Sequence, residues 1–429
     1  MTLSRRSILA GSLALGANVV RAGAAFDVDA VVVGAGVAGL AAAQTLRRRG
    51  KTCLVLEARP RIGGRVLTET GLGAPYEAGA FYIHWAERNP LTALAAAEGI
   101  ATTADTVPNI RSFDDGVETS QAMRAQRSGD FARLSALLDR EDEPDVSMAE
   151  IAHRATPPLD AAAAGIARLA LGEEPTRVSA LDYARLWSGG DLVVPSGYSG
   201  LVGALARGAD VRLSTPVRSV DWSGPGVAVE TDNGTIRARA AIVTVPIGVL
   251  KADGVRFRPD LPAATRNALD GIGMGALSKI GLSFDVSRFN PPRGDIFSRD
   301  GASLFDFDCR PLDRDVVVAI FGGEFARTIT RTERDAVQTA LDALVAVAGS
   351  DARRAFREGK LHAWHAEPFS LGAYSHCEPG HAGARDVLAQ PLADRVYFAG
   401  EATAPVGGAM TTGGAYLAGQ AAAEQVAAR

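Results

Sequence analysis

Three glycines near the start of the chain have the spacing of a nucleotide-binding turn. Gly34, Gly36 and Gly39 form a G-x-G-x-x-G pattern, and Glu57 follows about 20 residues later. The first glycine permits a tight turn, the second lets the backbone approach a pyrophosphate, and the third lets a helix pack closely. Glu57 would accept hydrogen bonds from ribose hydroxyls, which disfavours a 2′-phosphate and hence NADP. The pattern predicts a dinucleotide site at a helix N-terminus, where free N–H groups bind phosphate.

The elements around this pattern are of the kinds that it requires. The apolar run 28–33 predicts a buried parallel strand, 40–49 predicts a helix, and 52–56 predicts the next strand. Further strands are predicted at 211–213, 217–222, 227–231, 235–239, 241–245, 276–284, 316–321 and 395–399, and further helices at about 131–140, 147–154, 160–171, 332–348 and 414–428. Dinucleotide-type signals at both ends of the chain therefore predict one composite α/β domain, interrupted by a second domain.

A second glycine- and arginine-rich segment follows Glu57 directly. Ala58, Arg59, Gly64 and Arg65 belong to an E-x-R-x-R-x-G-G-R run that extends the phosphate-binding surface, and a nicotinamide dehydrogenase has no need of it. This run after G-x-G-x-x-G resembles the flavin-containing amine oxidase family, which includes monoamine oxidases, polyamine oxidases and histone demethylases. The resemblance extends over nearly the whole chain, through segments 77–84, 195–205, 216–220, 244–250, 257–262, 275–280, 364–375 and 397–419.

The resemblance implies a two-domain FAD protein. The FAD domain would comprise 25–85, 195–250 and 385–429, and a substrate-binding domain of mixed sheet and helices would comprise 86–194 and 251–384. Glu401 would meet the ribityl or pyrophosphate part of FAD, and the backbone at Val217 would hold the adenine. The expected FAD-binding residues are Gly34, Gly36, Ala38, Gly39, Glu57, Ala58, Arg59, Gly64, Arg65, Gly79, Ala80, Val217, Trp364, Gly400, Glu401, Gly414 and Ala415.

The FAD is expected to be held without a covalent bond. Some members of the family attach it through a Cys before the aromatic residue at the flavin, and that position is Ala373 here; Cys377 is at the wrong position. The helix that starts at Gly414 would point its dipole at the flavin and stabilise negative charge on the reduced form.

The resemblance also implies a set of catalytic residues. Lys279 would hold a water against flavin N5 in a site where burial lowers its pKa, and Tyr374 would form one aromatic wall over the reactive face. The opposite wall is Thr411, where monoamine oxidases carry a Tyr, so the cage would be half aromatic. Trp364 is either a second aromatic residue at the site or core packing, and His84 either binds substrate or is structural.

The expected reaction is oxidation of an amine at its α-carbon to an imine, which hydrolyses to an aldehyde or ketone, while O2 reoxidises the flavin and yields H2O2. An L-amino-acid oxidase, which needs an Arg for the substrate carboxylate, or another flavin oxidoreductase of the same fold is the alternative. A non-catalytic flavoprotein is a further alternative, against which the presence of Lys279 and Tyr374 argues. The identity of the amine and the formation of a homodimer are left open.

His362 and His365 lack further ligands in a metal pattern, so no metal is expected.

Composition and the N-terminus bound the remaining possibilities. The 429 residues carry a net charge of −4, without the basic field that nucleic-acid binding requires.

Residues 1–24 combine Arg5, Arg6, a short apolar stretch and a small-residue cleavage site, which predicts a secretory signal and not a membrane span. The run from Ser4 to Leu9 resembles a bacterial twin-arginine signal, against the alternative of general secretion. We therefore expect an acidic periplasmic protein that is exported folded.

Overall fold

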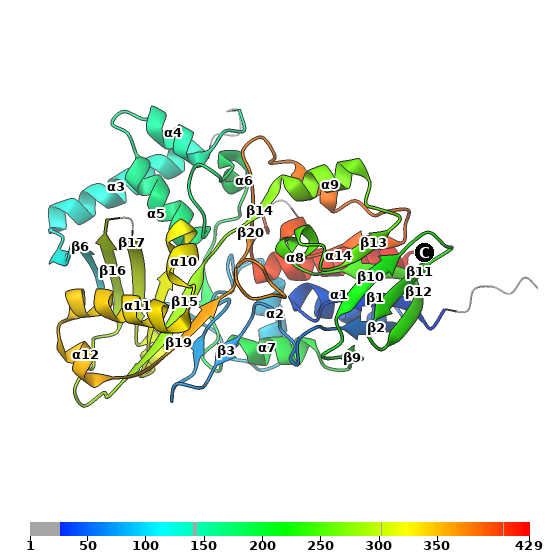
Figure 1. Cartoon of the computed structure of the whole chain (residues 1–429), viewed down its shortest axis with the longest axis horizontal. Helices are drawn as coiled ribbons and strands as arrows, with labels where there is room; N and C mark the ends of the chain where they lie inside the picture. Colours follow the sequence, from blue (N-terminus) through cyan, green and yellow to red (C-terminus); the bar gives the residue numbers. More distant parts are fainter. Residues whose placement is uncertain (1–25, 140–143, 302, 406) are drawn as a thin grey trace, which may run out of the picture.

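The computed structural model describes residues 26–139, 144–301, 303–405 and 407–429. The expected signal peptide, 1–24, lies outside the described residues. The chain forms two large sheets with helices packed around them, and the two sheets occupy opposite ends of the long axis (Figure 1). Within the described part of the chain, no helix is both long and apolar enough to cross a membrane.

The first sheet is built on the strand that precedes the glycine pattern. Strand β1 (Val28–Val33) is nearly all apolar and pairs in parallel with β2 (Cys53–Leu56) on one side and β12 (Gly234–Val243) on the other. The full order is β13-β10-β11-β12-β1-β2-β9, with β21 also paired to β12. The other strands are β9 (Val211–Arg212), β10 (Val217–Asp221), β11 (Val227–Thr231), β13 (Arg256–Arg258) and β21 (Val396–Phe398).

This sheet differs from the sequence-based expectation in the bounds of one strand and in the domain to which another belongs. The strands predicted at 235–239 and 241–245 are one continuous strand, β12, because its first half pairs with β11 and its second half with β1 and β21. Strand β13 lies within 251–384, the range expected for the substrate-binding domain, and pairs in parallel with β10 in this first sheet.

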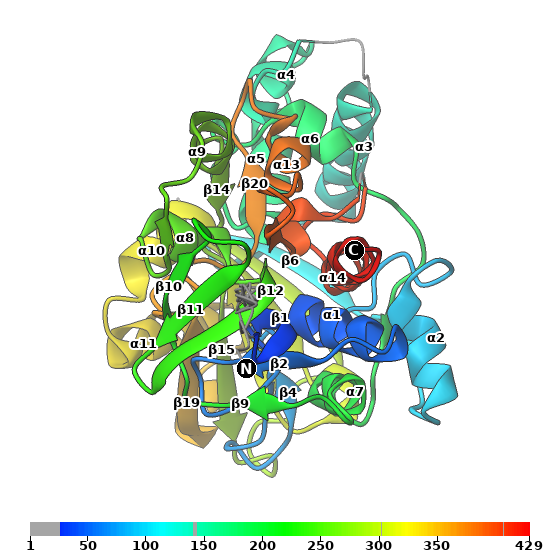
Figure 2. The same ribbon diagram turned by 90° about the vertical axis from the view of Figure 1, so that its right-hand side faces the viewer.

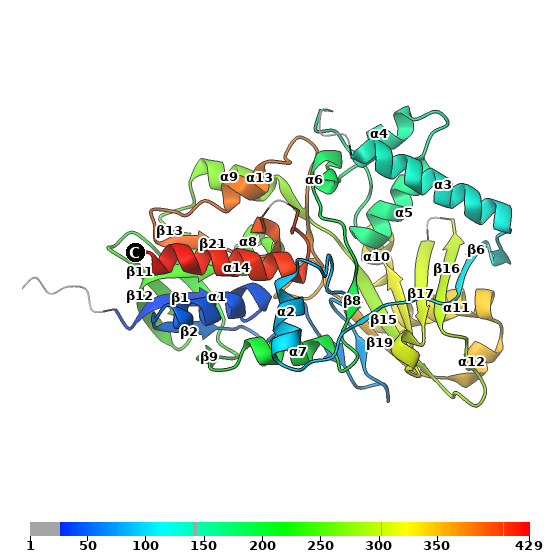
Figure 3. The same ribbon diagram turned by 180° about the vertical axis from the view of Figure 1, so that it is seen from behind.

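Helices α1 and α14 cover this sheet side by side (Figure 3). Helix α1 (Val37–Arg48) begins directly after Gly36, and α14 (Thr412–Ala427) is the last helix. A Cβ at Gly419 would lie 2.0 Å from the carbonyl oxygen of Ala38, so the two helix backbones approach closely. Helices α2 (Pro90–Ala97) and α7 (Tyr198–Leu205) complete the same apolar core. This packing sets the start of α1 against the middle of α14.

The second sheet has the order β19-β15-β18-β17-β16-β6-β7. Its strands are β6 (Ile110–Asp114), β7 (Val117–Glu118), β15 (Ser278–Phe284), β16 (Gly294–Asp300), β17 (Ser303–Cys309), β18 (Val317–Phe321) and β19 (Phe356–Ala363). Alternate side chains such as Ile280, Phe305 and Phe307 pack against α11 (Glu333–Ala348), which lies across one face of the sheet (Figure 1). Because strand side chains alternate, Lys279, Asp306 and Asp308 project from the opposite face.

A group of helices packs beside the second sheet and lies at the top of Figure 2. It contains α3 (Gln121–Leu138), α4 (Met148–Arg154), α5 (Asp160–Ala170) and α6 (Ala180–Ala184) around one apolar cluster. The remaining elements are β3 (Thr68–Glu69), β4 (Tyr76–Glu77), β5 (Thr103–Ala104), β8 (Leu192–Val193), β14 (Ile272–Met274), β20 (Ser375–Cys377), α8 (Ile247–Lys251), α9 (Ala263–Asp270), α10 (Gly323–Ile329), α12 (Asp351–Ala355), α13 (Ala384–Leu388), η1 (Pro311–Asp313) and η2 (Glu401–Thr403).

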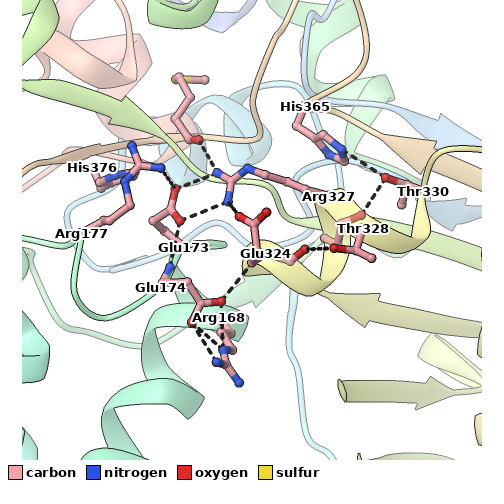
Figure 4. A network of polar contacts seen from close by, with 12 residues as sticks. Arg168, Glu173, Glu174, Arg177, Glu324, Arg327, Thr328, Thr330, His365 and His376 are labelled. Carbon is pink, nitrogen blue, oxygen red and sulfur yellow. Dashed lines mark hydrogen bonds and ion pairs between the residues drawn. The ribbon is translucent and has the colours of Figure 1, made fainter. Parts of the chain in front are cut away.

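An ion-pair network joins this helical group to the second sheet (Figure 4). Buried Glu173 accepts two hydrogen bonds from Arg327 of α10, at 3.1 and 2.7 Å, and Arg327 also donates to the carbonyl of Met274. Next to it, Arg168 of α5 forms a separate two-pronged pair with Glu174. The network fixes the end of α5 on α10, close to one wall of the cavity described below.

Candidate active site

A cavity of about 600 Å³ lies between the two sheets. It reaches from the glycine turn after β1 to the face of the second sheet that carries Lys279. All the expected site residues line it except Gly39 and Gly414. A Cβ at Gly39 would lie 1.9 Å from the carbonyl oxygen of Gly34, and one at Gly414 would lie 1.7 Å from that of Gly408. These two glycines therefore allow backbone segments to approach each other beside the cavity.

One end of the cavity has the form of a dinucleotide cradle. Gly34 has a φ of +107°, which only glycine adopts readily, and a Cβ there would lie 2.6 Å from the Thr244 hydroxyl. A Cβ at Gly36 would meet nothing within 4 Å, so this glycine faces open space at the start of α1. The Glu57 carboxylate accepts from the backbone N–H groups of Ala35 and Arg59, both at 2.8 Å, and these bonds fix it at the cavity wall.

Arg59 and Arg65 line the cavity but also bind a distant loop. Arg59 pairs with Glu367, donates to Ser370 and lies 5.6 Å from the ring centre of Phe369. Arg65 donates to the carbonyl oxygen of Ala373 at 2.8 Å and to Glu401 at 3.0 Å. The contacts of Arg59 and Arg65 with the 364–375 loop are present in the structure, whereas contact of either side chain with a cofactor stays a prediction.

The lining residues fit a flavin dinucleotide. The glycine turn and Glu57 suit a pyrophosphate and a ribose, and Val217 lines the cavity beside them. At the other end, Thr411, Thr412 and Ala415 bring the N-terminus of the 16-residue helix α14 to the cavity, where its positive end suits a reduced, anionic ring. FAD bound here would extend from α1 to the Lys279 face. Ala373 leaves this segment without a thiol at the expected attachment position, and Cys377 is buried in β20.

Lys279 is buried at the cavity wall and held by two backbone carbonyls. Its Nζ donates to Glu77 at 3.1 Å and to Gly79 at 2.9 Å, and lies 5.8 Å from the ring centre of Phe81. Burial lowers the pKa of the Lys279 ammonium. An ammonium has three N–H donors, so one remains for the cavity.

The other expected catalytic residues also line the cavity, in different settings. Trp364 donates from its indole N–H to the carbonyl of Ala78, at 2.9 Å, and is buried. The Thr411 hydroxyl accepts from the Gly414 N–H and donates to the Gly408 carbonyl, so it caps α14. His84 is half-exposed at the rim and lies 3.0 Å from an Asp191 oxygen.

Tyr374 faces the same cavity. Burial raises the pKa of its hydroxyl, so the ring stays neutral and serves as an aromatic wall.

Sequence reasoning missed a group of carboxylates on the second sheet. Asp306 and Asp308 of β17 and Asp295 of β16 line the cavity, and Asp295 pairs across the strands with Asp308. Within the described residues, no side chain forms a hydrogen bond or ion pair with these three carboxylates, and one Asp306 oxygen is fully buried without a partner. The Phe-Asp-Phe-Asp alternation at 305–308 was the available signal, because it predicts a strand with acidic residues on one face.

Burial and mutual repulsion perturb the three carboxylates, which we call the acidic cluster. Burial, together with the nearby Asp105, raises the pKa of Asp295 to about 6. Burial and the charges of Asp295 and Asp105 raise the pKa of Asp308 to about 7. Burial and the charges of Asp295 and Asp308 raise the pKa of Asp306 well above its ordinary range. Asp105 itself is partnered, by the Tyr82 hydroxyl at 3.1 Å and by Arg293. Lys279 and Arg293 lower the pKa of Asp308, but within the described residues neither cation forms an ion pair with it.

The fold and the cavity define a dinucleotide-binding flavoprotein with a buried lysine at its reactive end. The sequence profile of flavin-containing amine oxidoreductases matches residues 37–427. The chain belongs to this family, which confirms the expected fold class, the FAD cofactor and the oxidation of amines.

Known proteins of this family show the extent of the similarity. Polyamine oxidase 4 of Oryza sativa subsp. japonica is 28% identical over 92% of this chain and 88% of its own length. Lysine-specific histone demethylase 2 of Homo sapiens is 27% identical over 93% of this chain but only 53% of its own length. A structure of putrescine oxidase bound to putrescine superposes with a TM-score of 0.77 at 22% identity, covering 94% of this chain and 99% of that one, and it shows the shared fold.

Glu57→Ala should lower FAD occupancy and leave the turnover of the loaded enzyme near normal. The carboxylate lies at the dinucleotide end, where it would bind ribose, and Lys279 and Tyr374 line the opposite end. The measurement is the ratio of flavin to protein after purification, followed by turnover per bound flavin. Acid should release the FAD of both proteins, because the residue directly before Tyr374 is Ala373 and not a cysteine. Full occupancy in the variant would contradict the assignment of Glu57.

Proposed function

We propose that this enzyme oxidises an amine that carries a second cationic nitrogen, a diamine or a polyamine. The observation that carries the proposal is the acidic cluster, three carboxylates without partners that face the cavity in which Lys279 lies. Buried carboxylates require a cation or a proton, and an alkylammonium ion supplies both charge and hydrogen-bond donors. Similarity to a polyamine oxidase and to putrescine oxidase supports the same class of substrate.

The strand register sets the distance between the two charges of the substrate. Lys279 lies opposite Ile320 of β18, and Ile320 lies opposite Asp306 of β17. Two strand spacings therefore separate the backbones of Lys279 and Asp306, about 10 Å. In a substrate whose reacting carbon lies near Lys279, a second nitrogen separated from that carbon by several methylenes would reach the acidic cluster. An amino acid is disfavoured, because the cluster would repel its carboxylate.

The residues of the chain have separate tasks in this reaction. FAD, when bound, would supply the acceptor for the two electrons and the hydrogen that leave the α-carbon of the amine. Tyr374 and Trp364 exclude water and orient the alkyl chain, and Lys279 presents one N–H donor to the cavity. Burial lowers the pKa of the Lys279 ammonium, which makes it a better proton donor than an exposed lysine. The acidic cluster binds the nitrogen that does not react.

A peroxide-release screen with substrates of matched length tests this proposal. Butane-1,4-diamine, its mono-N-acetyl derivative and n-butylamine differ at the second nitrogen alone. Because an ion-paired hydrogen bond contributes about 1.5–3 kcal/mol, kcat/KM should be ~10- to 100-fold higher for the diamine than for the other two compounds. Equal rates for diamine and monoamine, or a preference for L-amino acids, would refute the proposed substrate class.

We further propose that the chain is exported folded to the bacterial periplasm. The support is the sequence of residues 1–24, with Arg5 and Arg6 ahead of a short apolar stretch. A twin-arginine route carries folded proteins, which would allow the FAD to be inserted before export.

Arg5→Lys together with Arg6→Lys should retain folded, FAD-loaded protein in the cytoplasm. The substitution keeps the positive charge that general secretion requires and removes the arginine pair that the twin-arginine route reads. Cell fractionation with a flavin assay measures the distribution. Normal periplasmic accumulation of the variant would favour general secretion.

A further inference from the structure

Four charges of alternating sign run through the interior beside the flavin cavity. Asp182 of α6 accepts from Arg385 of α13 through both carboxylate oxygens, at 2.8 and 2.9 Å. Glu401 of η2 accepts from Arg65 at 3.0 Å. Ser375 of β20 joins the two pairs, because its hydroxyl accepts from Arg385 at 2.7 Å and donates to Glu401 at 2.7 Å. The row therefore links α6 to the FAD-binding motif.

This row holds the backbone on both sides of Tyr374. The carbonyl of Ala373 accepts from Arg65 at 2.8 Å, and the N–H of Ser375 donates to Glu401 at 3.2 Å. The carbonyl of Tyr374 accepts from the Gly275 N–H at 2.9 Å. The position of the aromatic wall is thus determined by side chains that are distant in the sequence.

The row also sets the charge at the cavity. Glu401 lines the cavity, whereas Asp182, Ser375 and Arg385 do not. Burial alone would raise the pKa of Glu401, but Arg65 and Arg385 outweigh it, so the pKa is lowered and Glu401 is ionised. Without Arg385, an incompletely balanced negative charge would face the bound flavin and oppose its reduction.

We propose that Arg385 is a positioning residue for the oxidation: acting through Ser375 and Glu401, it holds Tyr374 in place and balances the negative charge of Glu401 at the flavin. The inference rests on the flavin chemistry of the family and is independent of which amine is oxidised. Its failure would therefore leave the proposed substrate class untouched.

The main test is a double variant, Asp182→Asn with Arg385→Met, which removes both partners and leaves no buried charge unpaired. We expect a folded, FAD-loaded protein in which the midpoint potential of the flavin is lower than in the wild type. With the best amine of the screen, kcat should fall ~10- to 100-fold and KM should change less than about 3-fold, because a small displacement of Tyr374 affects the reacting geometry.

A matched control is Arg168→Met with Glu174→Gln, which removes a comparable two-pronged pair seen in Figure 4. It should keep the wild-type potential and kcat, because neither residue contacts the Tyr374 segment. Ser375→Ala deletes one buried hydroxyl, keeps all four charges, and should lower kcat with KM unchanged. If the double variant does not fold, the kcat of Ser375→Ala tests the proposal by itself. Three results would overturn the proposal. The first is a wild-type kcat and flavin potential in the FAD-loaded double variant, and the second is a wild-type kcat in Ser375→Ala. The third is a control variant whose kcat and potential shift as much as those of the double variant.

Discussion

The Lys279→Met variant should keep its FAD and lose most of its catalytic activity. The side chain lies at the reactive end of the cavity, away from the glycine turn, so occupancy should not change. Removing the one N–H that remains for the cavity should cost about 2–4 kcal/mol in the transition state, a rate loss of ~30- to 1,000-fold. Stopped-flow measurement of flavin reduction by amine, and of reoxidation by O2, would show which half-reaction depends on the lysine.

The control for this variant is Lys251→Met. The Lys251 ammonium also donates to two backbone carbonyls, those of Asp270 and Ile272, but it lies outside the cavity. Both variants lose the same kind of structural contact, so a stability effect would appear in both and a catalytic effect in Lys279→Met alone. Wild-type rates in both half-reactions of Lys279→Met would remove the main support for the active-site assignment.

Asp306→Asn together with Asp308→Asn should abolish the preference for a second cation. We expect kcat/KM for butane-1,4-diamine to fall ~100-fold, while that for n-butylamine changes less than about 3-fold. The amides keep the volume and polarity of the carboxylates, so the cavity shape is preserved. Asp300→Asn, at the exposed end of the same hairpin, is the matched control and should behave as the wild type. Parallel losses for both substrates would assign the cluster to folding instead of specificity.

The same cluster predicts a pH dependence with a definite sign. The pKa of Asp308 is raised to about 7 and that of Asp295 to about 6, so both take up protons as the pH falls through this range. A protonated carboxyl no longer attracts an ammonium ion. The ratio of kcat/KM for diamine over monoamine should therefore rise between about pH 5.5 and 7.5. Using the ratio cancels the titration of the reacting amine. The double variant keeps Asp295, so its ratio should rise much less over the same range.

Much of the fold and of the cofactor site could be predicted from sequence because its signals are local. Gly34, Gly36 and Gly39 act within one turn, and the apolar run of β1 needs burial on both faces wherever it lies. The expected helices at 147–154, 160–171 and 332–348 correspond to α4, α5 and α11 within one residue at each end. Lys279 and Tyr374 were found because each lies in a recognisable segment of the family.

The remaining features were decided by pairings between residues far apart in the chain. Arg59 and Arg65 stand in a phosphate-binding motif, yet their partners Glu367 and Glu401 lie some 300 residues later. Strand register brings Asp295 opposite Asp308 and sets Asp306 two strands from Lys279, which no local pattern contains.

The sequence by itself therefore determined a flavin-binding turn, its flanking elements and the lysine of the site. Only the tertiary structure decided which charges meet their partners, as in the row from Asp182 to Arg65, and which are left facing the cavity, as in the acidic cluster. The physical reason is that a local motif needs only neighbours along the chain, whereas the state of a buried charge depends on every segment packed around it.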